Sequence, residues 1–111
     1  MTTEVTAAGE GAAVLRPQGR LTMVTAPQFR KLIEETVRGG RARIVVDLSA
    51  TDFMDSSGLG ALIAGLKTAR QAGGDLRIAA LTPQVTTVLE LTNLDRVLRP
   101  HETVAAALDA G

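Results

Sequence analysis

The sequence predicts an α/β fold in which helices pack on a mixed β-sheet. A strand-like opening is followed by segments that alternate between helix and strand patterns to the end of the 111-residue chain. This order produces parallel strands joined by right-handed crossovers. Residues 44–46 are Ile-Val-Val without polar alternation, as expected of a central strand covered on both faces. We therefore expect one domain with a sheet of four to five strands and about four helices packed on it.

The first half of the chain contains a predicted hairpin and a predicted helix. Residues 3–8 and 12–16 are the two strands, and a glycine-containing loop joins them. The helix begins at Thr25, which forms a capping-box pattern with Gln28, and it ends at the glycine pair 39–40. Its predicted buried face is apolar at helical spacing and contains Phe29, Leu32, Ile33 and Val37.

The second half alternates between helices and strands. After a predicted linker over residues 49–55, apolar residues at helical spacing between positions 59 and 69 predict a second helix, which ends at the glycine pair 73–74. Residues 76–80 alternate like a strand. A threonine and a proline start a third predicted helix over residues 82–93. The alanine-rich residues 102–108 form the last predicted helix.

The composition excludes several classes of partner and site. Twelve basic residues balance twelve acidic ones, and Trp and Tyr are absent, so neither nucleic acid nor a membrane surface is an expected partner. The chain has no cysteine, which excludes disulfides and thiolate metal sites. The opening residues do not have the pattern of an export signal, and no segment has the length of a membrane span. We therefore expect a cytoplasmic protein.

The most unusual stretch is residues 51–60, which connects the predicted central strand to the following helix. Ligands and partners meet open α/β sheets at this carboxyl edge. Ser56 and Ser57 occupy the first turn of the helix, where backbone N–H groups lack intrahelical partners and the helix dipole favours negative charge. The alternative is that Asp55 or one of the serines is only a helix cap and that the glycines serve tight packing. The residues alone leave both interpretations open.

Enzymatic functions have weak support. The sequence around Ser56 is not the Gly-x-Ser-x-Gly of a serine hydrolase, and His101 is the only histidine that could act as its base. We expect His101 at a loop-to-helix junction, in an exposed capping role. Asp52 and Asp55 have no histidine or further acidic cluster nearby in the sequence, so a metal or acid–base site is not expected. The chain is predicted to be no enzyme, with no metal site and no cofactor of its own.

Residues 53–60, Phe-Met-Asp-Ser-Ser-Gly-Leu-Gly, resemble the signature of anti-sigma factor antagonists of the SpoIIAA and RsbV type, in the STAS domain family. Supporting similarity extends through Gly19-Arg20-Leu21, Thr25-Ala26-Pro27, residues 45–48, Gly73-Gly74 and residues 105–108. The resemblance implies a single STAS domain over residues 1–111. It also implies that Ser56 is the phosphorylated serine.

The function that this resemblance implies is a switch between protein partners. The chain would bind an anti-sigma factor with serine kinase activity and so release a sigma factor. The kinase would donate phosphate from ATP to Ser56 and turn the chain off, and a serine phosphatase would reset it. The expected docking face around Ser56 contains Thr22, Met23, Val24, Met54, Asp55, Ser57, Gly58, Leu59 and Gly60.

One position departs from the family pattern. Family members commonly carry an aspartate where this chain has Thr22, close to the phosphorylated serine. The change from carboxylate to hydroxyl leaves an alternative function open, that of a STAS domain without phosphorylation. Such a domain would act as a structural subunit beside a lipid-transport ATPase or inside a signalling scaffold.

Overall fold

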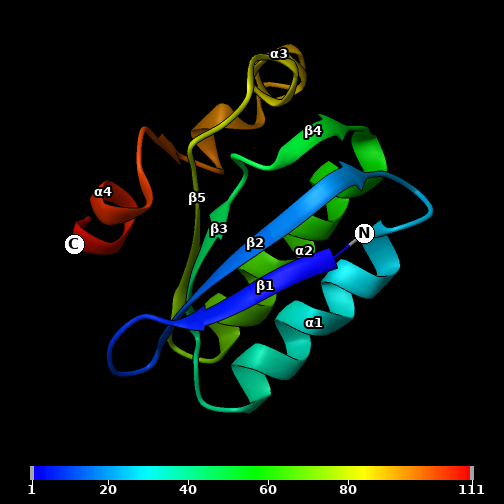
Figure 1. The fold of residues 1–111 in the computed structure, drawn as a ribbon. Helices are drawn as coiled ribbons and strands as arrows, with labels where there is room; N and C mark the ends of the chain where they lie inside the picture. Colours follow the sequence, from blue (N-terminus) through cyan, green and yellow to red (C-terminus); the bar gives the residue numbers. More distant parts are fainter. Residues whose placement is uncertain (1, 111) are drawn as a thin grey trace.

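A computed structural model describes residues 2–110 of the chain (Figure 1). Its elements, in chain order, are β1 (Thr2–Ala7), β2 (Ala12–Leu21), α1 (Ala26–Arg38), β3 (Arg43–Asp47), β4 (Thr51–Met54), α2 (Ser56–Gln71), β5 (Asp75–Ala79), α3 (Pro83–Leu91), a 3-10 turn (Leu94–Arg96), β6 (Pro100–His101) and α4 (Val104–Asp109). The predicted α/β class is confirmed, and so is the number of helices.

The sheet is mixed and has the strand order β1-β2-β3-β5-β6, with β4 paired to the end of β2. Strands β1 and β2 form the predicted antiparallel hairpin, and the other pairs are parallel. The prediction of a central strand is confirmed, because β3 lies between β2 and β5 and its residues 44–46 are buried. Within residues 2–110 the sheet has six strands, more than the four or five expected, because β4 and β6 are too short to show a strand pattern.

Helices α1 and α2 pack side by side on one face of the sheet and enclose the main core (Figure 1). Phe29 and Ile33 of α1 and Leu62 and Leu66 of α2 are fully or almost fully buried there, as their helical spacing predicted. The opposite face is covered by α4 at a smaller apolar cluster around Ala107. The packing of α2 on the sheet places the start of α2, and therefore Ser56, at the carboxyl edge of the sheet.

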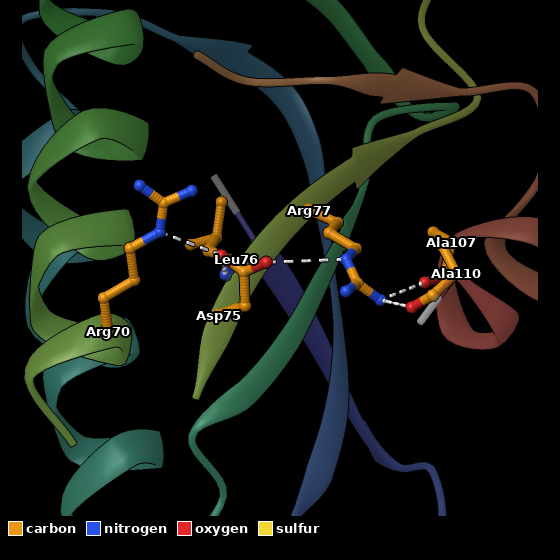
Figure 2. A network of polar contacts seen from close by, with 6 residues as sticks. All are labelled: Arg70, Asp75, Leu76, Arg77, Ala107 and Ala110. Carbon is orange, nitrogen blue, oxygen red and sulfur yellow. Dashed lines mark hydrogen bonds and ion pairs between the residues drawn. The ribbon is translucent and has the colours of Figure 1, made fainter. Parts of the chain in front are cut away.

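Figure 2 shows how a polar network holds α4 in place. Arg77 on β5 donates hydrogen bonds to the carbonyl oxygens of Ala107 and Ala110 at the end of α4. Its guanidinium also pairs with Asp75 at 3.6 Å, and Asp75 in turn pairs with Arg70 at 3.3 Å. A cation suits this position because the carbonyl groups at a helix C-terminus carry partial negative charge.

Three local predictions were wrong. Strand β2 does not end at residue 16 but continues to Leu21, because Gly19 adopts a left-handed φ of +99° and the pairing with β4 shifts register there. The Thr25 side chain does not cap α1; its hydroxyl instead accepts from the Thr22 N–H and donates to the Arg20 carbonyl. His101 lies on β6 and not at a helix junction.

Candidate functional site

The start of α2 is positioned by β4, one of the two strands that the sequence patterns did not predict. Met54 pairs with Leu21 at the end of β2, and the Asp55 N–H donates to the Leu21 carbonyl at 3.3 Å. The other edge of β4 is closed by Gln84 of α3. Its amide accepts from the Met54 N–H at 2.8 Å and donates to the Met54 carbonyl at 3.0 Å. Strand β4 is therefore hydrogen-bonded along both of its edges, and only Asp55 separates its end from Ser56.

Ser56 is exposed at the first position of α2, immediately after the N-cap residue Asp55. One carboxylate oxygen of Asp55 accepts from the N–H groups of Ser57 at 2.9 Å and Gly58 at 3.1 Å. Its other oxygen accepts from the Met23 N–H at 3.2 Å. Asp55 is therefore a helix cap, as one of the two interpretations proposed, and it also ties α2 to the loop between β2 and α1.

That loop presents Met23 and Val24 to solvent, with 72% and 83% of their surfaces exposed. Its backbone is closed by the Thr22 carbonyl, which accepts from the N–H groups of Thr25 and Ala26, and by the Thr22 hydroxyl, which accepts from the Val24 N–H at 3.3 Å. Two apolar side chains are therefore displayed on an ordered turn. The hydrogen bond from Met23 links this turn to Asp55, the residue that precedes Ser56.

The structure divides the predicted docking face into two groups. Met23, Val24, Ser56 and Gly60 are exposed, and Thr22, Asp55 and Ser57 are half-buried beside them. Met54, Gly58 and Leu59 are buried, so their assignment to a docking face was wrong. Met54 and Leu59 belong to the main core. Gly58 packs so closely on β2 that an added Cβ would lie 2.4 Å from the Leu21 carbonyl oxygen.

Within residues 2–110, the structure does not bring a histidine to Ser56. His101 lies on β6, which is separated from β2 and β4 by β3 and β5 in the strand order, so it is not placed to act as a base for Ser56. Within residues 2–110, no group of three or more acidic, histidine or cysteine side chains is arranged to bind a metal ion. What the arrangement offers chemically is an exposed hydroxyl beside a carboxylate and an apolar turn.

No sequence pattern indicates that Gln84 is part of this site. It follows Pro83 in a segment that was interpreted only as a helix start, and its two contacts are with a strand 30 positions earlier. The hydrogen bond between Asp55 and Met23 spans 32 positions. Neither contact has a local sequence signal, because both depend on the folded arrangement of β4 between β2 and α3.

The double role of Asp55 leads to a prediction about stability. Asp55→Ala is expected to lower the free energy of unfolding by about 2 kcal/mol, because three N–H groups lose their acceptor. Asp55→Asn keeps an acceptor oxygen and is expected to lower it by less than about 1 kcal/mol. Urea denaturation followed by circular dichroism measures both. An Asp55→Ala protein as stable as the parent would contradict the assigned role.

In the part of the chain that the structure describes, no helix combines the length and apolar character required to span a membrane.

Comparison with known proteins confirms the family that the sequence resembles. The model of the STAS domain family matches residues 5–107. A protein of Thermotoga neapolitana, provisionally named an anti-sigma factor antagonist, is 31% identical over 101 residues, which are 90% of this chain and 89% of the relative. The crystal structure of an anti-sigma factor antagonist from Mycobacterium paratuberculosis has a TM-score of 0.85 at 32% identity and covers 96% of this chain and 90% of its own.

The fold is also that of unphosphorylated SpoIIAA, with a TM-score of 0.83 at 22% identity over 97% of this chain and 94% of that one. The relatives named above are regulatory proteins, in agreement with the prediction that the chain is no enzyme. The chain belongs to the STAS domain family, and its sequence and fold are similar to those of anti-sigma factor antagonists.

Proposed function

We propose that this chain is an anti-sigma factor antagonist that binds a kinase-type anti-sigma factor, releases a sigma factor, and is switched off by phosphorylation of Ser56. The observation that carries this proposal is the position of Ser56. Ser56 is exposed on the first turn of α2. The residue before it, Asp55, accepts a hydrogen bond from Met23, which lies with Val24 on an exposed apolar turn. A partner that covers Met23 and Val24 also covers Ser56.

A phosphate on Ser56 would act on the interface and not on the fold. It adds nearly two negative charges at an exposed side chain, beside the carboxylate of Asp55. The start of a helix tolerates negative charge because of the helix dipole, so the domain stays folded. Covering the same dianion with an apolar partner surface costs several kcal/mol, so the partner dissociates.

The partner supplies the chemistry of the switch. Phosphoryl transfer requires bound nucleotide, metal ions and a positioned base, so the anti-sigma factor brings ATP and the catalytic groups. The chain is the substrate and needs no cofactor of its own. A separate serine phosphatase restores the hydroxyl, and the whole cycle runs in the cytoplasm, where ATP and sigma factors are present.

The partner must first be identified. Kinase-type anti-sigma factors of the source organism are purified and titrated with the parent chain by calorimetry, and the tightest binder becomes the probe for the experiments below. If none of them binds, the proposal is contradicted. Stable association with a transporter ATPase, without any phosphorylation, would then favour the alternative of a structural STAS subunit.

The phosphorylation site has a direct test. Incubation of the chain with the probe kinase, ATP and magnesium is expected to add one phosphate, measured by intact mass. Ser56→Ala is expected to receive none, because the acceptor hydroxyl is gone, whereas Ser57→Ala remains a substrate. The assignment fails if Ser56→Ala is still modified and Ser57→Ala is not.

A further inference from the structure

Packing within the domain does not require a glycine at position 60. It lies on α2 and is exposed, and a Cβ added to it meets nothing within 4 Å. Two other glycines of α2 differ in this respect. A Cβ added to Gly58 would lie 2.4 Å from the Leu21 carbonyl oxygen, and a Cβ added to Gly65 would lie 2.7 Å from the Ile33 side chain. A glycine inside a helix costs about 0.5–1 kcal/mol relative to alanine. At Gly60 the chain bears this cost without an internal packing benefit.

Gly60 lines a groove of about 730 Å³ between the N-terminal parts of α1 and α2. Its lining includes the nearly or fully buried Ala26 and Ala61, one from each helix. The exposed side chain of Met23 and the half-buried Ser57 also line it. The groove therefore shares Met23, Ser57 and Gly60 with the proposed docking face, and Ser57 is the residue next to Ser56.

Among the described residues that line the groove, basic side chains outnumber acidic ones by two to one. Arg30, Lys31 and Glu34 of α1 line it. Arg30 pairs with Glu34 at 3.9 Å, whereas Lys31 is exposed and makes no ion pair within residues 2–110. A partner that fits this groove has an acidic side chain opposite Lys31.

We propose that the groove between α1 and α2 binds a helix of the anti-sigma factor, which places its apolar edge against the exposed Met23, Pro27 and Gly60, above a floor formed by the buried Ala26 and Ala61, and an acidic residue near Lys31. This inference rests on the proposed function and adds a second contact to the one at Ser56. Small residues on a helix surface let another helix approach closely, and a shallow apolar groove is a common receptor for an amphipathic helix. The missing side chain of Gly60 provides room for that helix.

The test fills the groove without disturbing the core. Gly60→Leu places a side chain into open space and improves helix propensity, so the melting temperature is not expected to fall. Its affinity for the probe anti-sigma factor is expected to drop about 30-fold. The matched control is Gln71→Leu, an exposed residue of α2 three turns further along the same face and outside the groove lining, which is expected to bind like the parent.

A second pair of variants tests the charge. Lys31→Glu is expected to weaken binding about tenfold at low ionic strength and less at high salt, because screening reduces the repulsion. Lys67→Glu makes the same change at an exposed residue of α2 that does not line the groove and is expected to have no effect.

The outcomes separate this inference from the function on which it rests. If Gly60→Leu and Lys31→Glu bind like the parent while Ser56→Asp does not bind, the groove is not the receptor and the proposed function stands. If Ser56→Asp also binds like the parent, the proposed function itself fails.

Discussion

Gly58→Ala is expected to lower the free energy of unfolding by about 3 kcal/mol, although alanine is the better helix former. The added Cβ would lie 2.4 Å from the Leu21 carbonyl oxygen and 2.9 Å from side-chain carbons of Leu21 and Met54. The backbone oxygen cannot move aside, because the Leu21 carbonyl accepts the hydrogen bond from the Asp55 N–H. To admit the methyl group, α2 would have to move away from β2, which disrupts the start of the helix.

Gly60→Ala is the matched control, two residues further along the same helix. Its Cβ meets nothing within 4 Å, so the substitution is expected to raise the free energy of unfolding by about 0.5–1 kcal/mol. Urea denaturation of both variants gives the comparison. If Gly58→Ala were as stable as the parent, the close packing of α2 on β2 would be contradicted.

Ser56→Asp is expected to weaken binding of the anti-sigma factor at least about 100-fold, equivalent to about 2.7 kcal/mol. The aspartate places a second carboxylate next to Asp55, at an exposed position that a partner on Met23 and Val24 would cover. Two neighbouring carboxylates must then lose water, and Asp55 makes no ion pair within residues 2–110 that would offset the loss, which costs several kcal/mol. A phosphate carries more charge than aspartate, so its effect is expected to be larger.

Two controls locate this effect at the interface. Ser56→Ala removes the hydroxyl without adding charge and is expected to keep affinity within about threefold of the parent. Ser56→Asp is expected to unfold at the same urea concentration as the parent, since negative charge at the first turn of a helix is favourable. A loss of binding that was accompanied by unfolding would place the switch in the fold instead.

Much of the fold follows from sequence patterns. Helices α1 and α2 were predicted because their apolar residues recur at helical spacing, and β3 was predicted from its unbroken β-branched run. Strands β4 and β6 were missed because a strand of four residues and one of two residues have too few positions to show alternation. The end of β2 was missed because Gly19 normally interrupts a strand, whereas here its positive φ allows the strand to bend and pair with β4.

The site was predicted less completely than the fold. Ser56, Met23 and Val24 are exposed, as a docking face requires, whereas their roles in phosphorylation and partner binding stay predictions. Leu59 was wrongly assigned to the surface, although its spacing to Leu62 and Leu66 is that of one buried helical face. The links from Asp55 to the turn and from Gln84 to β4 join residues about 30 positions apart, so only the folded structure reveals them.

The central claim is that added charge on Ser56 evicts the anti-sigma factor from a domain that stays folded. Its most direct test is a calorimetric titration of the anti-sigma factor with the chain before and after enzymatic phosphorylation, with full modification verified by intact mass. We predict measurable binding before phosphorylation, none at the same concentrations afterwards, and an unchanged circular dichroism spectrum. Equal affinity of the two forms would contradict the account.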